Sequence, residues 1–94
     1  MKVECVFHLV LRSSEDGGGQ FNTLQFQASL PFAPTKEIEY AFPSYSEHGA
    51  RANSITFDFQ SGVFVVFLEP EQMTKAEYPD REKHLKEYGW KELS

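Results

Sequence analysis

Residues 55–68, with the sequence ITFDFQSGVFVVFL, contain the strongest structural signal in the chain. Two runs rich in β-branched and aromatic residues flank Ser61 and Gly62. Glycine readily adopts the positive φ that a tight hairpin turn requires, so this pattern predicts a β-hairpin with a two-residue turn. Alternate residues of such a hairpin share one face. The pairs expected on the core face are Phe59 with Phe64, Phe57 with Val66, and Ile55 with Leu68.

Two earlier segments alternate between rows of side chains with the same period of two. Residues 2–12 and 21–30 therefore predict two further strands, each with one row directed toward the core. The residues expected in these core rows are Val3, Cys5, Phe7, Leu9 and Leu11, followed by Leu24, Phe26, Ala28 and Leu30. Residues 36–42 alternate over a shorter length and predict a short additional strand.

Two connections are expected to be flexible loops, at about residues 13–20 and 43–53. The first contains three consecutive glycines, which are disfavoured inside a strand or a helix. The second is rich in serine, glycine, asparagine and charged residues. Because the first loop joins two successive strands, an antiparallel hairpin is the simplest topology for them.

The C-terminal part of the chain has the pattern of a single helix. Asp80 is a candidate N-cap, and Thr74 followed by Glu77 offers an earlier capping box. Leu85 and Tyr88 are expected to form the buried stripe. A helix this short is marginal alone, so we expect it to dock on the sheet.

Together these segments predict one domain, residues 1–94, of the α+β class. The expected order is β-β-(β)-β-β-α, which describes a twisted antiparallel sheet of four to five strands with one C-terminal helix packed on it. A chain of 94 residues is long enough for one hydrophobic core and too short for two.

The charge balance bears on what the domain binds. Fourteen acidic residues outnumber nine basic ones, which gives a formal net charge of −5. A phosphate-binding surface needs clustered Lys and Arg, so we expect no binding to nucleic acid or to a membrane. The chain has one cysteine and no apolar run near the roughly 20 residues of a membrane-spanning helix, so we expect a cytoplasmic protein.

The sequence carries no recognisable catalytic, metal-binding or nucleotide-binding motif. Cys5 and His8 are three positions apart on a predicted strand, which directs their side chains to opposite faces. The histidines at positions 8, 48 and 84 lack the spacing typical of metal ligands. No lysine and helix follow the glycines at 17–19, as a phosphate loop requires. We therefore predict no catalytic residue, metal or cofactor, and do not favour an enzyme.

A second apolar row runs along the first strand and the hairpin, on the side away from the core. Its members are Val6, Val10, Val63, Val65 and Phe67. Either other residues of the chain cover this row, or it stays exposed as an interaction surface, since contiguous exposed apolar patches usually mark binding sites. The residues that would cover it are Ile38, Tyr40, Phe42 and Trp90.

These observations favour a non-catalytic protein-interaction module. It would bind a protein partner or a second copy of itself, as a homodimer, through the apolar sheet face or an edge strand. The alternative is a small-ligand-binding protein, or a small enzyme, with a pocket between helix and sheet. The polar groups expected in that pocket are Tyr40, Tyr45, His48 and His84.

Overall fold

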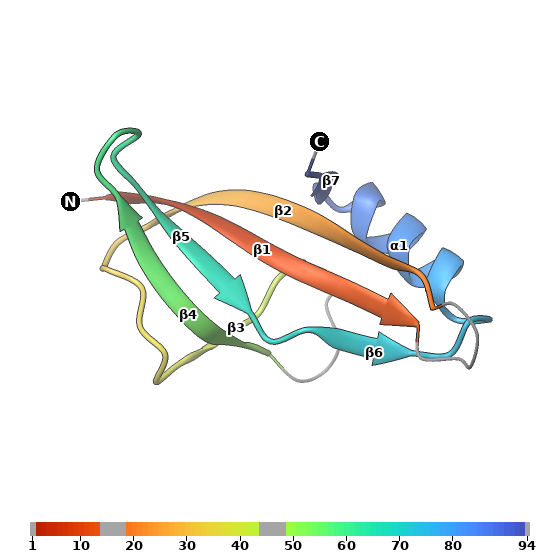
Figure 1. Ribbon diagram of the computed structural model, residues 1–94. Coiled ribbons are helices and arrows are strands. Elements are labelled where there is room, and N and C mark those ends of the chain that lie inside the picture. Colours follow the sequence, from red (N-terminus) through yellow and green to blue (C-terminus); the bar gives the residue numbers. More distant parts are fainter. Residues whose placement is uncertain (1, 14–18, 44–48, 94) are drawn as a thin grey trace.

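A curled sheet forms most of the molecule, and one helix packs against its inner face (Figure 1). The computed structural model describes residues 2–13, 19–43 and 49–93, and the molecule measures 45 × 27 × 24 Å. The elements in this part of the chain are β1 (Val3–Ser13), β2 (Phe21–Leu30), β3 (Glu39–Tyr40), β4 (Ala50–Asp58), β5 (Val63–Leu68), β6 (Glu71–Met73), α1 (Tyr78–Glu87) and β7 (Lys91–Glu92). None of the described helical residues belongs to a helix long and apolar enough to cross a membrane.

β1 is the central strand of the sheet. The strands follow the order β3-β4-β5-β1-β2-β7, and β6 also pairs with β1. β2 runs antiparallel to β1, whereas β5 and β6 run parallel to it. The α+β class with one C-terminal helix is thus confirmed, but the prediction of a wholly antiparallel sheet of four to five strands is wrong.

The parallel pair follows from the long connection between β2 and β4. After β2 the chain crosses to the far edge of the sheet, where β3 and β4 lie, and β5 then returns beside β1 in the same direction as β1 (Figure 1). The period of a strand identifies its two faces. It carries no information about which strand is its neighbour or in which direction that neighbour runs.

The hydrophobic core lies on the inner face, which we define as the side of the sheet that faces α1. Alternate residues of β1 are at most 1% exposed there, as predicted: Cys5, Phe7, Leu9 and Leu11. Trp90 is also 1% exposed, and its ring centroid lies 5.3 Å from that of Phe26 and 5.0 Å from that of Phe42. Aromatic side chains from β2 and the segment after β3 therefore join the row of β1 in one core.

α1 begins after a reciprocal capping interaction between Thr74 and Glu77. The backbone N of Thr74 donates to Glu77 Oε1 at 3.1 Å, and the backbone N of Glu77 donates to Thr74 Oγ1 at 3.2 Å. Tyr78 and Leu85 are the buried helix residues. The prediction that Tyr88 would be buried is wrong, because it is 44% exposed and the buried stripe starts earlier in the helix, at Tyr78.

Gly89 turns the chain back toward the sheet after α1. Its φ is 102°, a conformation that L residues with a side chain rarely adopt. The backbone N of Trp90 donates to the carbonyl of Leu85 at 3.2 Å, which closes the end of the helix. This turn brings the Trp90 ring into the core.

The β4–β5 hairpin forms, but its register differs from the predicted one by two residues. Phe57 pairs with Phe64, and the turn contains four residues in place of two. The Asp58 carboxylate accepts hydrogen bonds from the backbone N of Gln60 at 2.9 Å and from Ser61 Oγ at 2.8 Å. This local capping of the turn by an aspartate stabilises the longer loop, which the glycine signal alone did not predict.

The change of register moves two aromatic residues out of the core. A shift of two residues keeps each side chain on its face, and Val66 and Leu68 are buried as expected. Phe59 lies in the turn and is 92% exposed, and Phe57 is 38% exposed, so the predicted burial of both is wrong. The hairpin extends beyond the inner-face core and carries exposed aromatic side chains at its tip.

The predicted loops differ from the structure at their ends. β4 begins at Ala50, so the predicted loop at 43–53 ends earlier than expected. Ser13 belongs to β1, which therefore extends into the other predicted loop. The flexibility predicted for the two loops concerns mainly residues 14–18 and 44–48, which lie outside the described residues.

Candidate interaction surface on the outer face

Five apolar residues that were predicted to form an interaction surface lie together on the outer face, opposite α1. β1 contributes Val6 and Val10, and β5 contributes Val63, Val65 and Phe67. The parallel pairing places Val6 directly beside Val65. Neighbouring strands are about 4.8 Å apart, so the two rows form one continuous surface. We call these five residues the outer patch.

The outer patch is much more exposed than the inner face. Phe67 is 40% exposed and the four valines are half-buried, whereas Val66, between two patch residues of β5, is fully buried on the inner face. Apolar side chains that stay accessible together on one sheet face mark a candidate interaction surface.

The residues that were expected to cover this row lie on the inner face. The Tyr40 ring is 5.1 Å from Phe7, and the Phe42 ring is 5.0 Å from Phe7. Ile38 and Trp90 belong to, or pack against, the same core cluster. The interpretation in which these four residues cover the outer row is therefore wrong. They pack beneath the sheet because β3 lies at its edge and the following segment passes under β1 and β2.

His8 belongs to the same surface, although the sequence did not single it out there. It lies between Val6 and Val10 in the row of β1, and its register partner on β5 is Phe67. The two rings are 5.0 Å apart and nearly perpendicular, at 69°. Burial lowers the pKa of His8 below its ordinary value, so the neutral ring is favoured. Its position between Val6 and Val10 could have identified His8 as part of this surface, because a neutral imidazole packs well among apolar side chains.

Uncharged polar residues border much of the outer patch. The neighbouring positions on β2 and β4 that share its face are Thr23, Gln25, Gln27, Ser29, Ser54 and Thr56. Glu4, Arg12 and Asp58 lie further out on the same face. An apolar centre depleted of charge and surrounded by a polar rim is the usual anatomy of a protein–protein contact.

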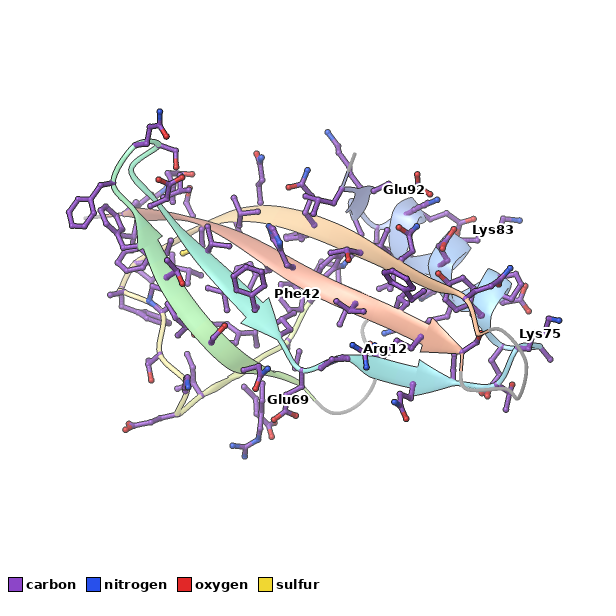
Figure 2. All side chains as sticks on the ribbon, in the orientation of Figure 1. Arg12, Phe42, Glu69, Lys75, Lys83 and Glu92 are labelled. Carbon is purple, nitrogen blue, oxygen red and sulfur yellow. The ribbon has the colours of Figure 1, made fainter. Side chains whose placement is uncertain are left out.

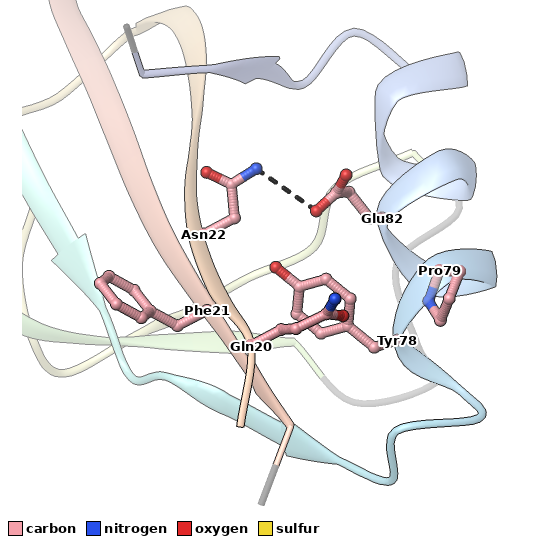
Figure 3. A pocket seen from close by; sticks show the side chains of 6 residues that line it. All are labelled: Gln20, Phe21, Asn22, Tyr78, Pro79 and Glu82. Carbon is pink, nitrogen blue, oxygen red and sulfur yellow. Dashed lines mark hydrogen bonds between the residues drawn. The ribbon is translucent and has the colours of Figure 1, made fainter. Parts of the chain in front are cut away.

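An open hollow of about 450 Å³ lies between the start of β2 and α1 (Figure 3). It is lined by Gln20, Phe21, Asn22, Tyr78, Pro79 and Glu82. Asn22 Nδ2 donates to Glu82 Oε2 at 3.3 Å, and Lys86 Nζ donates to Glu82 Oε1 at 3.1 Å. Burial would raise the pKa of Glu82, but its hydrogen bonds with Lys86, Asn22 and Tyr78 outweigh this effect and lower it. The polar groups here already bind one another and join α1 to β2.

Tyr78 has a strongly raised pKa at this hollow. Its burial, together with its hydrogen bond to Glu82, raises the pKa of the phenol to about 12. A phenol with so high a pKa stays protonated and donates its hydrogen to the carboxylate. Tyr78 is therefore suited to holding the helix on the sheet, and poorly suited to act as a base.

Of the four polar residues predicted to line a pocket, the two that the structure describes, Tyr40 and His84, do not line this hollow. The hydroxyl of Tyr40 is occupied by Thr35, accepting from its backbone N at 2.9 Å and donating to its carbonyl at 2.7 Å. His84 is exposed on α1, beside Tyr88. Tyr45 and His48 lie outside the described residues. The expected pocket is thus unsupported at the two positions that the structure describes.

Cys5 and the acidic residues offer no reactive site in the described structure. Cys5 is 1% exposed, and burial, followed by the charge of Glu4, raises the pKa of its thiol. A buried thiol with a raised pKa is a poor nucleophile. Among residues 2–13, 19–43 and 49–93, no three His, Cys, Asp or Glu side chains are grouped so that they could hold a metal ion.

Comparison with known proteins adds no assignment. No protein-family model matches the chain, and no match was found to a curated protein or to a solved structure. The function is therefore inferred from the surfaces and contacts of the chain itself.

Proposed function

We propose that this protein is a non-catalytic protein-interaction module. The observation that carries the proposal is the outer patch, a continuous apolar surface on β1 and β5 that is bordered by uncharged polar side chains. Such a surface releases water when another protein surface packs against it, and this release is the main source of binding free energy.

The chemistry of the outer face favours a protein as the partner. The chain has a net charge of −5, and the surface lacks the basic cluster that nucleic acids or anionic lipids need. With its single cysteine buried, the protein is also suited to the cytoplasm, where thiols stay reduced. A second copy of the chain is the simplest partner, because two-fold symmetry lets one surface serve both subunits.

A lysine in the centre of the outer patch tests the proposal. Val65 is paired with Val6 on one side and with Thr56 on the other, so Val65→Lys places a charge in the middle of the surface. We expect this variant to stay folded and to have a lower average mass than the wild type at high concentration. Sedimentation velocity from micromolar to millimolar protein measures the mass, and thermal unfolding checks the fold.

Gln72→Lys is the matched control. Gln72 is an exposed strand residue on β6 that pairs with Arg12, so it lies on the same face but outside the five residues of the outer patch, and its substitution adds the same charge. We expect this variant to associate like the wild type. Equal masses for Val65→Lys and the wild type at every concentration would contradict self-association through the outer patch. Unfolding of Val65→Lys would show that Val65 is part of the core.

A further inference from the structure

Most of one edge of β4 has no paired strand in the described part of the chain. β3 pairs with this edge only at Ala50 and Arg51, and β5 pairs with the opposite edge. An unpaired strand edge presents a row of backbone donors and acceptors to a further strand. The stretch available for such pairing is residues 54–58, after the bulge at residue 53.

The hydrogen bonds of the hairpin indicate which backbone groups face outward. The carbonyl of Asp58 accepts from the backbone N of Gly62 at 2.8 Å, so the backbone of Asp58 is directed into the hairpin. Inward and outward pairs alternate along an antiparallel strand. Thr56 is therefore also directed toward β5, while Ile55 and Phe57 direct their N–H and C=O groups to the outer edge.

This edge has few of the devices that usually keep strands apart, since its bulge lies before residues 54–58. Residues 54–58, with the sequence SITFD, contain no lysine and no proline, and Asp58 at the turn end is their only charged residue. Of the labelled charges, Lys75, Lys83 and Glu92 lie at the end of the molecule that carries α1, and Glu69 lies near the start of β4, outside residues 54–58 (Figure 2). The edge of β2 is likewise paired over two positions, with β7 at Leu24 and Gln25. The β4 edge is the candidate for pairing with a second copy because residues 54–58 can pair with themselves symmetrically.

We propose that the β4 edge pairs with the β4 edge of a second copy of the chain, antiparallel about a two-fold axis through Thr56. In this register Ile55 of each copy faces Phe57 of the other. Both residues direct their backbone groups outward, so the two Ile55–Phe57 pairs together form four backbone hydrogen bonds. Registers centred on Ile55 or on Phe57 lose one of these pairs to the bulge or to the turn.

The side chains of residues 54–58 are complementary to themselves in this register. On the inner face, each Ile55 packs against the partner copy's half-exposed Phe57, a favourable pairing of a β-branched with an aromatic side chain. On the outer face Thr56 meets its own copy, and Asp58 meets Ser54. No like charges face each other, although the chain carries a net charge of −5.

Edge pairing joins the two sheets and leaves both outer patches on the same side of the assembly. The contact uses the backbone of β4, whereas the proposed binding surface uses side chains of β1 and β5. This inference therefore does not depend on the proposed function, and variants of the two surfaces distinguish them.

A disulfide across the two-fold axis tests the register. Thr56 pairs with itself as a non-hydrogen-bonded pair, whose Cα atoms lie about 4.5 Å apart, within the range of a disulfide. Thr56→Cys should therefore form a covalent dimer under mild oxidation, about tenfold faster than Ser54→Cys, because the two thiols are held together. Ser54 is the matched control, since it is exposed on the same face of β4 but opposes Asp58 of the other copy. The wild-type protein, oxidised in the same way, measures any cross-linking through the buried Cys5.

The same experiment in a Val10→Lys background separates the two surfaces. Val10 belongs to the outer patch but lies on β1, two strands away from β4, whereas Val65 is the register partner of Thr56. We expect Thr56→Cys to cross-link equally fast in the Val10→Lys background. Equal rates for Thr56→Cys and Ser54→Cys would overturn the inference, as would a wild type that stays monomeric at millimolar concentration. Cross-linking that Val10→Lys abolishes would also overturn it, because it would assign the contact to the outer patch.

Discussion

The two ends of the inner face follow the same alternation but differ in the burial of their aromatic and aliphatic side chains. At the helix end, Leu9, Leu11 and Leu24 are fully buried, beneath a cover that includes Leu85. At the hairpin end, Phe59 is 92% exposed although the sequence pattern assigns it to the same face. There are two reasons: Phe59 lies in the four-residue turn, and α1 lies at the end of the sheet away from that turn (Figure 1). Alternation determines the side of the sheet, and a covering element determines burial.

The difference between the ends has an energetic consequence. Burial of apolar area is the main favourable term in folding, and it requires atoms on both sides of a side chain. Phe7 contacts the rings of Tyr40 and Phe42 beneath the sheet. Phe59 has a ring contact with Phe57, which is itself partly exposed. Equal side chains at the two ends should therefore contribute very differently to stability.

Phe7→Ala should have the largest effect of the variants considered. Removing this buried ring leaves a cavity at the centre of the core, so we expect the free energy of unfolding to fall by about 3–5 kcal/mol. Phe59→Ala is the matched substitution at the hairpin end, and it should change stability by no more than about 0.5 kcal/mol. Urea titration of both variants measures the difference. A similar loss for the two would mean that the hairpin tip is covered in solution.

Two glycines allow the helix end and the hairpin end to be compared through smaller losses of stability. Gly89→Ala should lower stability by about 1–2 kcal/mol, because its φ is 102° and the added Cβ would lie 3.2 Å from the Phe26 ring. Gly62→Ala should cost about 1 kcal/mol, since its φ is 73° but a Cβ meets no atom within 4 Å. Thermal unfolding of the pair tests this order. A larger loss for Gly62→Ala would contradict the view that the helix end is the tightly packed one.

The smallest expected effect concerns pH and the outer face. Burial lowers the pKa of His8 in the folded protein, so folding favours its neutral form. Its contribution to stability is therefore complete above the unfolded pKa of about 6.5, and is lost as the pH falls through the lowered folded pKa. The neighbouring groups on its face are Val6, Val10, Gln25 and Phe67, while Glu4 and Arg12 lie four positions away along β1.

His8→Gln should remove this part of the pH dependence. We expect the free energy of unfolding of the wild type to decline more steeply than that of the variant just below neutral pH. Urea titrations at a series of pH values measure both slopes. Identical slopes would show that His8 has the same pKa in the folded and the unfolded protein.

Most of the candidate surface could be predicted from the sequence, but its membership was incomplete. Val6, Val10, Val63, Val65 and Phe67 were assigned to one face because a strand's period of two is a property of its backbone geometry. His8 was not included in the predicted surface because histidine is classed as a polar residue, and its apolar neighbours are known only from the structure. Tyr40 and His84, the two described residues of those proposed for a pocket, were chosen by residue type, and type alone does not place side chains at one site.

The sequence by itself determined the local features of this protein. The alternating rows of β1 and β2, the Thr74–Glu77 cap and the turn at Gly89 all depend on backbone geometry within a few residues. The tertiary structure alone decided that β5 runs parallel to β1, that α1 covers one end of the inner face, and that Phe59 is left outside it. These outcomes depend on which distant segments pack together, and a local pattern of side chains does not determine that packing.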